Sequence, residues 1–237
     1  MKKLIALAVS AMLLISLTAC GGEKTSEITQ NQETPTVQVK KVPVRSELYD
    51  MGGNLMANIS YEYTADSKLI SNTTTWVDSW GGSSETDTYT YSADGYVTSK
   101  TTSYSDSDYA SVRYYEYDQD GNLVKEYFEP DYGTRYVYHT DGRISESYNY
   151  NSGGETLWQT YSYTDATMTQ TEVWDDWVFE YITHYDSNGN ILKWVYNCNG
   201  ENMINHNYTY DGEGNLTRQD VSIEGWKMEG YVVHYYE

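Results

Sequence analysis

The chain has 237 residues and a formal net charge of −20, with an isoelectric point near 4.4. So acidic a chain offers no basic surface to neutralise phosphates, which excludes nucleic acid as a partner and electrostatic binding to anionic lipid. Its 27 tyrosines and 7 tryptophans also exclude the aromatic-poor composition of a disordered protein, because aromatic rings supply buried area in place of aliphatic side chains.

The first 19 residues have the pattern of a signal peptide. Lys2 and Lys3 precede an apolar stretch over 4–17, which is too short to span a bilayer and fits the hydrophobic region of such a peptide. The stretch ends in Leu-Thr-Ala-Cys, which resembles the lipobox of bacterial lipoproteins. The resemblance implies cleavage before Cys20, a lipid on its sulfur, and an extracytoplasmic protein held on a membrane of the bacterial envelope. The alternative is a secreted protein whose cysteine carries no lipid.

Residues 20–43 form the predicted link between this anchor and the folded part. They are rich in Glu, Thr, Gln, Ser and Lys and contain no aromatic residue, which predicts a flexible tether. The second cysteine, Cys198, has no disulfide partner if Cys20 is lipidated, and no neighbouring residue suggests a catalytic thiol. The folded domain is therefore predicted over 44–237.

This domain contains a repeated motif in which Tyr-x-Tyr leads into a glycine-containing turn and then an aliphatic residue. The alternation predicts a strand that ends in a three-residue hairpin loop, with glycine in the left-handed position. The turn glycines of the copies are Gly53, Gly95, Gly121, Gly142, Gly189 and Gly214. The register predicts facing pairs Tyr91 and Val97, Tyr117 and Leu123, Tyr138 and Ile144, Tyr185 and Ile191, and Tyr210 and Leu216.

The stretches between copies are looser turns rich in Gly, Asp, Ser and Asn, and no segment after Cys20 shows a helical period. The predicted fold class is therefore all-β, an antiparallel meander of hairpins after a helical signal peptide. Residues 231–237 match the first strand of a copy and are predicted to complete the sheet. A curved sheet, an open barrel and a solenoid all agree with this pattern, because stacked hairpins bury what one hairpin cannot.

The motif Tyr-Asp-x-x-Gly-Asn-Leu, as in residues 117–123, 185–191 and 210–216, resembles the tyrosine–aspartate (YD or RHS-type) repeat of bacterial surface and toxin proteins. The resemblance covers about 47–237 and implies a surface location and a repeat architecture. In large family members many repeats wind into a shell around a toxin, whereas this chain has eight copies and no toxin domain.

Candidate chemistry is sparse. Asp118, Asp120 and Asn122 place oxygens at alternate positions, but the glycine comes one residue too early for an EF-hand calcium loop, so a hairpin turn explains them better. The four histidines fall at irregular offsets and are predicted to lie on strand surfaces. The sequence contains no nucleophile elbow, phosphate-binding loop or HExxH motif. We therefore expect no metal, no cofactor and no catalysis, and a hydrolase using paired carboxylates is the least favoured alternative.

The seven tryptophans all lie outside the Tyr-x-Tyr segments. Two interpretations are open: the rings complete a core poor in aliphatic residues, or they form a face on which sugar rings stack. The candidate binding residues are Trp76, Trp80, Trp158, Trp174 and Trp177. The predicted function is a non-enzymatic binding or envelope-interaction module at the cell surface, with a surface protein as partner; the alternative is a glycan- or cell-wall-binding protein.

Overall fold

The computed structural model describes residues 41–223 and 228–236. The predicted signal peptide, Cys20 and the tether up to residue 40 lie outside the described residues. The all-β meander is confirmed, with one 3₁₀ turn, η1 (Asp78–Trp80), and no described helix long and apolar enough to cross a membrane. The strands are β1 (Pro43–Asp50), β2 (Leu55–Tyr63), β3 (Leu69–Trp76), β4 (Ser84–Tyr91), β5 (Val97–Tyr104), β6 (Ser107–Tyr117), β7 (Leu123–Glu129), β8 (Tyr132–Tyr138), β9 (Ile144–Asn151), β10 (Gly154–Tyr163), β11 (Thr167–Trp174), β12 (Trp177–Tyr185), β13 (Ile191–Cys198), β14 (Glu201–Tyr210), β15 (Leu216–Ile223) and β16 (Met228–Tyr236).

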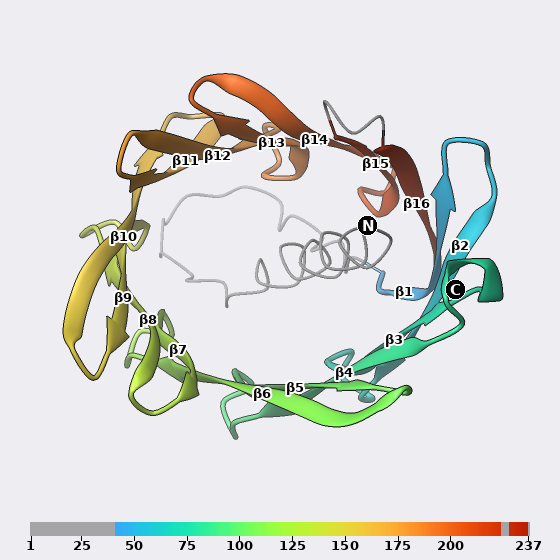
Figure 1. The fold of residues 1–237 in the computed structure, drawn as a ribbon, viewed down its shortest axis with the longest axis horizontal. Coiled ribbons are helices and arrows are strands. Elements are labelled where there is room, and N and C mark those ends of the chain that lie inside the picture. The colour runs from blue at the N-terminus through green and yellow to red at the C-terminus, as the bar shows by residue number, and fades with distance from the viewer. Residues whose placement is uncertain (1–40, 224–227, 237) are drawn as a thin grey trace, which may run out of the picture.

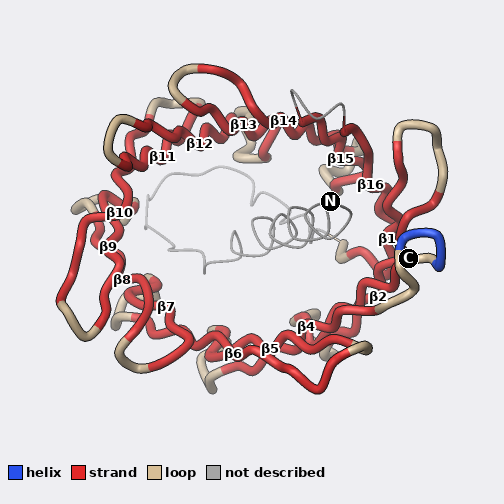
Figure 2. The backbone as a smooth tube through the Cα atoms, viewed as in Figure 1, coloured by secondary structure: helices blue, strands red, loops and turns tan. Residues whose placement is uncertain are grey.

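The sheet closes on itself as a barrel. Each strand pairs antiparallel with the next along the chain, and the ring is completed where β1 pairs with β16, for example Ser46 opposite His234 (Figures 1 and 2). Sixteen tilted strands spaced ~4.8 Å apart give a ring about 30 Å across between opposite backbones. Closure removes both sheet edges, which would otherwise be open to pairing with another chain.

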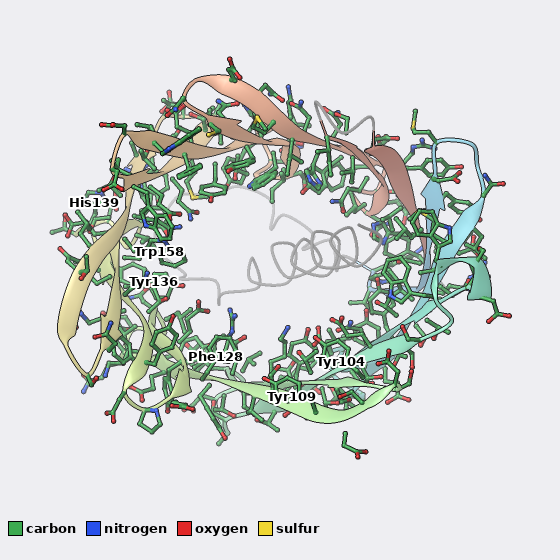
Figure 3. The ribbon with its side chains drawn as sticks, in the orientation of Figure 1. Tyr104, Tyr109, Phe128, Tyr136, His139 and Trp158 are labelled. Atoms are coloured by element: carbon green, nitrogen blue, oxygen red, sulfur yellow. The ribbon has the colours of Figure 1, made fainter. Side chains whose placement is uncertain are left out.

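The tyrosines of the Tyr-x-Tyr segments lie on the inner wall of the barrel. Tyr136 and Trp158 point inward in Figure 3. Directly paired residues share a face, so the register carries this assignment around the ring from Tyr136 through Ser147 to Gln159 and onward. The alternate positions, such as Arg135, face outward.

The predicted register is present in the structure: all five tyrosine–aliphatic pairs are directly opposite one another. The six turn glycines have φ between 78° and 88°, because the loop needs a left-handed residue there. At each of these five pairs the ladder shifts by one residue, as a hairpin that ends in a glycine bulge requires.

Tyrosine hydroxyls link successive repeats. The second tyrosine of a copy donates to the backbone carbonyl of a residue that begins a strand one repeat earlier, as Tyr138 does to Leu123 at 2.7 Å. The same bond recurs from Tyr63 to Pro43, Tyr91 to Leu69, Tyr163 to Ile144, Tyr210 to Ile191 and Tyr236 to Leu216. The motif therefore specifies contacts between neighbouring hairpins as well as the turn within each one.

An antiparallel meander places alternate turns at opposite ends of the barrel. One end, the repeat rim, carries the turns that follow β2, β4, β6, β8, β10, β12 and β14. The other end, the variable rim, carries the remaining turns, including the one at Gly53. Most of the exposed large apolar side chains belong to the variable rim: Met51, Tyr104, Tyr109, Phe128, Tyr132, Leu157, Val173, Trp174, Trp177 and Val178.

The buried core is small and is supplemented by stacked rings. One apolar cluster joins β1–β3 to β16, and its members are Leu48, Met56, Ala57, Trp76 and Val232. On β12–β14 an array of rings with centroids 5.1–6.5 Å apart takes its place: Trp177, Phe179, Tyr196, Tyr181, Trp194 and His206. Aromatic contact thus replaces much of the aliphatic packing that the composition lacks.

Candidate functional site

A hollow on the inner wall lies beside the variable rim. It has a volume of about 250 Å³ and is bordered by side chains from five consecutive strands, β6 to β10. Glycine at position 133 lets β7 and β8 approach closely at this point, because a Cβ there would collide with the carbonyl of Glu126 and with Tyr127. The hollow is smaller than a site for a drug-sized molecule and has room for one ring-sized group.

Four aromatic residues border the hollow: Tyr127, Phe128, Tyr132 and Trp158. Trp158 is half-buried and points inward (Figure 3), while Phe128 and Tyr132 are 45% and 60% exposed. The Arg113 guanidinium lies 4.6 Å from the centre of the Phe128 ring, a cation–π contact that fixes one face of this ring. The exposed surfaces of Tyr132 and Phe128 remain open to a ligand.

Polar groups converge on the same space. Arg113 contacts the Glu126 carboxylate at 3.5 Å, and Thr134 donates a hydrogen bond of 3.4 Å to the side-chain oxygen of Asn149. Both contacts are long, so the guanidinium and the amide keep capacity for another partner. Aromatic faces with a few fixed donors and acceptors are the groups that bind a polyhydroxylated ring.

The phenols next to the hollow are neutral. Burial raises the pKa of Tyr136, and the nearby Glu126 carboxylate raises it further. Burial also raises the pKa of Tyr115 and of Tyr161 to about 12. These tyrosines therefore act as hydrogen-bond donors across the whole physiological pH range.

The structure does not bring the five candidate tryptophans together. Trp76 is only 9% exposed within the apolar cluster, and Trp80 is partly buried and packs against this cluster, so both rings contribute to the core. Trp158 alone borders the hollow. Trp174 and Trp177 face each other across the β11–β12 turn and are 69% and 55% exposed.

The prediction that all histidines lie on strand surfaces is wrong for two of them. His206 is fully buried and His234 is 9% exposed, because both lie on the inner wall among tyrosines. Burial lowers the pKa of each to about 4. Gln219 hydrogen-bonds to Nδ1 of His206 at 2.8 Å, and Ser46 bonds to Nδ1 of His234 at 2.7 Å. Both rings are therefore neutral structural groups at neutral pH.

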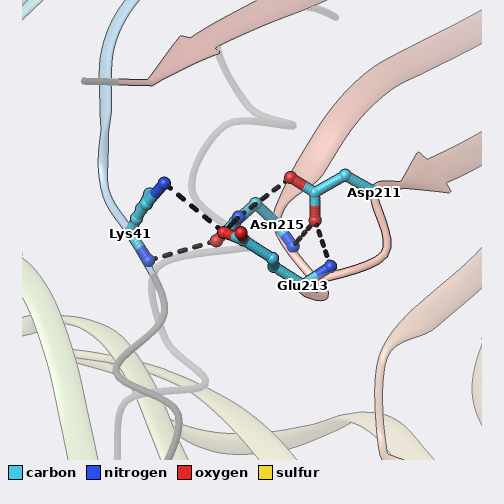
Figure 4. A network of polar contacts seen from close by, with 4 residues as sticks. All are labelled: Lys41, Asp211, Glu213 and Asn215. Atoms are coloured by element: carbon cyan, nitrogen blue, oxygen red, sulfur yellow. Dashed lines mark hydrogen bonds and ion pairs between the residues drawn. The ribbon is translucent and has the colours of Figure 1, made fainter.

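The oxygen-rich turns of the repeat rim are occupied by their own hydrogen bonds. Asp211 accepts bonds from the backbone of Glu213 and Asn215 at 2.9 Å, and its other oxygen accepts one from the Asn215 amide (Figure 4). These bonds lower the pKa of Asp211. The backbone N–H of Lys41 reaches the Asn215 side-chain oxygen at 3.1 Å, which ties the start of the described chain to this rim.

No group of three or more His, Cys, Asp or Glu side chains in residues 41–223 and 228–236 is arranged to hold a metal ion. Cys198 is a free, half-buried thiol at the end of β13. The Cys198 thiol is not among the residues that border the hollow.

Sequence reasoning did not identify most residues of the hollow. Arg113, Glu126, Phe128 and Asn149 are spread over three strands and share no spacing. The loose turn over 129–133 was recognisable, but its relation to Trp158 depends on a β-bulge. The ladder between β9 and β10 shifts between Leu157 and Gln159, and Trp158 occupies the extra position.

Comparison with known proteins finds similarity in structure and not in sequence. No protein-family model matches the sequence, and no curated protein sequence does. A porin-like protein from Bacteroides uniformis is 13% identical with a TM-score of 0.46, over 82% of this chain and 96% of that one. A porin-like protein from Bacteroides vulgatus is 13% identical with a TM-score of 0.28, over 84% and 99%. The TcdB2-TccC3-TEV structure is 15% identical with a TM-score of 0.34, and the match covers 88% of this chain but 11% of that one. These values are too low to transfer a function to this chain.

Proposed function

We propose that this chain is a membrane-tethered, non-enzymatic binding module of the bacterial cell envelope, and that its hollow takes one ring of a glycan. The observation that carries the proposal is the composition of the hollow. Phe128, Tyr132 and Trp158 offer aromatic faces, while Arg113 and Asn149 offer donors at its edge. Stacking and hydrogen bonding together are what a sugar ring needs from a binding site.

The outer wall favours a tethered barrel over one embedded in lipid. A barrel that spans a bilayer presents an apolar band on its outer surface. This wall carries arginine–carboxylate pairs at 2.6–3.1 Å, each arginine lying over an outward tyrosine ring. The pairs are Arg45–Glu47, Arg135–Glu155 and Arg218–Asp220. Moving such groups into hydrocarbon costs several kcal/mol each.

The point at which the predicted tether joins the barrel favours one orientation on the membrane. β1 begins at Pro43 on the repeat rim, where Lys41 contacts Glu213 at 3.4 Å and Asn215 at 3.1 Å. A lipid on Cys20 would hold this rim toward the membrane. The variable rim and the mouth of the hollow would then face away from it, toward the glycans of the cell envelope.

Retention on purified cell-wall glycan, combined with a glycan array, tests the proposal. We expect the wild-type protein to be retained, and Trp158→Ala and Tyr132→Ala each to reduce affinity at least tenfold, because each removes a stacking face. Tyr132→Ala guards against a folding defect, since this side chain is largely exposed. Trp174→Ala is the matched control and should bind like wild type.

Absence of retention for wild type, or equal retention by all three variants, would contradict the glycan assignment. The non-enzymatic character is tested on the same material: incubation of each retained glycan with the protein should leave its chain length unchanged. Release of shorter fragments that depends on a carboxylate of the barrel would show a hydrolase instead.

A further inference from the structure

A second surface of the variable rim, at the turn between β11 and β12, has the properties of a docking site. The pairing of β11 with β10 ends at Glu172, and the pairing of β12 with β13 begins at Phe179. Residues 173–177 therefore pair with no described strand outside their own hairpin. The tip extends past the neighbouring strands and is accessible from several sides.

Both faces of this tip are apolar. Trp174 and Trp177 face each other on one side, 69% and 55% exposed, and Val173 and Val178 pair on the other, 61% and 38% exposed. The Trp177 ring is supported from below by Phe179, whose centroid lies 6.5 Å away. Exposed apolar side chains clustered on one short element mark an interaction surface, and tryptophan is enriched among residues that dominate binding energy.

The end of the tip is negatively charged. Asp175 and Asp176 form the turn, and the structure shows no hydrogen bond or ion pair for either carboxylate within the described residues. Asp175 has a φ of 50°, as a two-residue hairpin turn requires. The described turns of the variable rim contain no lysine or arginine. The tip thus combines two apolar faces with unneutralised negative charge.

The apolar faces and the negative charge together distinguish among the molecules that could bind the hairpin tip. A lipid surface would have to take up two carboxylates, which is costly. A sugar would stack on the tryptophan face and leave the valine face in water. A second copy of the chain carries its own charge of −20 and would be repelled. Only a cleft in another protein buries both faces and neutralises the two aspartates.

We propose that residues 173–178 are a docking hairpin for a protein partner whose apolar cleft is bordered by lysine or arginine. Charge complementarity would guide the encounter, and burial of Trp174 and Trp177 would supply most of the affinity. This surface is separate from the hollow at Trp158, so the two assignments stand or fall independently.

Photo-crosslinking in cells tests the docking hairpin. The full-length chain carries p-benzoylphenylalanine at position 174, and the crosslinked product is identified and then purified for affinity measurements. We expect a protein adduct whose crosslinked segment lies in an apolar, basic-bordered cleft. Trp174→Ser with Trp177→Ser should weaken the purified pair at least tenfold. Asp175→Asn with Asp176→Asn should weaken it about threefold or more and reduce its dependence on salt.

A matched control keeps the test specific. Asp94→Asn with Asp120→Asn makes the same charge change at exposed positions of the repeat rim and should leave the affinity for the partner unchanged. The proposal is overturned if position 174 crosslinks only to lipid, to glycan or to a second copy. It is also overturned if no adduct forms, or if the repeat-rim variant loses as much affinity as the variants of the docking hairpin.

Discussion

At the repeat rim of the barrel, Asp118 and Asp211 direct their carboxylates into their own turns, as Asp50 does at the variable rim, whereas the aspartates of the docking hairpin do not. Asp118 accepts bonds from the backbone of Asp120 and Asn122 at 2.9 and 2.8 Å and from the Asn122 amide at 2.8 Å. Asp175 and Asp176 have no such bonds. The same residue type therefore stabilises the turn at Gly121 and is available for recognition in the docking hairpin.

Aromatic residues show the same division. Near the repeat rim the hydroxyl of Tyr138 bonds to the preceding hairpin, while at the variable rim Tyr109 and Trp174 are 66% and 69% exposed. A substitution destabilises the fold in a turn whose side chains are hydrogen-bonded or buried within the protein. A turn whose side chains have no partner in the protein can vary in sequence without loss of the fold, and these side chains can bind a ligand.

The largest difference in the free energy of unfolding is expected between alanine variants of two tryptophans near the variable rim. Trp76→Ala should lower the free energy of unfolding by about 3–5 kcal/mol, because it opens a cavity in the apolar cluster. Trp174→Ala should change it by less than about 0.5 kcal/mol, since this ring is mostly in solvent. Denaturant titration measures both. Equal losses would show that the docking hairpin is part of the core.

The pH at which stability is lost should differ between the buried histidines of the inner wall and the carboxylates of the turns. Burial lowers the pKa of His206 and His234 to about 4, against about 6.5 in an unfolded chain. The unfolded chain therefore takes up protons first, and stability should fall as the pH drops from about 6.5 to 4, by up to about 3 kcal/mol per histidine. The repeat-rim carboxylates, such as Asp118, have lowered pKa values. Their contribution should be lost only as the pH falls below the ordinary carboxylate range.

Denaturant titrations at pH 7, 5.5 and 4.5 measure this effect. His206→Gln should reduce the dependence on pH across this window while leaving the response below pH 4. A variant that keeps the full wild-type slope would show that the buried histidine does not control it.

Glycine substitutions compare the turns of the two rims directly. Gly142 has a φ of 82° and open space around it, so Gly142→Val isolates the cost of a left-handed backbone and should destabilise by about 1–2 kcal/mol. A Cβ at Gly153 would meet only the Asn151 side-chain oxygen, at 3.0 Å. Gly153→Ala should therefore cost less than about 0.5 kcal/mol. Similar thermal midpoints for the two variants would contradict the requirement for a left-handed residue at position 142.

The smallest effect is expected from single hydroxyl groups. Tyr138→Phe removes the bond to the Leu123 carbonyl and should destabilise by about 1 kcal/mol. Tyr109→Phe, at an exposed position of the variable rim, should be neutral. Calorimetry on the two variants would show whether the bond between repeats contributes to stability.

The repeat motif predicted the hairpins well because its information is local. Alternating tyrosines and a left-handed glycine determine the pairing of Tyr117 with Leu123 within seven residues of chain. Closure of the ring was not predictable in this way. It depends on β1 meeting β16 across nearly the whole domain, which is set by the twist summed over all sixteen strands.

The candidate site was less predictable than the fold. Tryptophan identity alone does not distinguish the buried Trp76 from the exposed Trp174, because both adjoin loose turns. The inward direction of Trp158 depends on the bulge at Leu157, and the partners of its ring come from four other strands. Such a site is created by closure and register together, and neither is encoded near Trp158 in the sequence.

In the orientation proposed above, the repeat rim faces the membrane and the variable rim faces away from it. Lipid-quencher fluorescence tests this orientation on the full-length, lipidated chain in vesicles, with Cys198→Ser as background and one fluorophore at Gln119→Cys or Ser152→Cys. Both positions are exposed, one on each rim. Strands of 7–11 residues at a tilt of about 40° separate the rims by roughly 20 Å. We predict strong quenching at 119 and little at 152, and none at either position after Cys20→Ala. Equal quenching at the two positions, or stronger quenching at 152, would contradict the account.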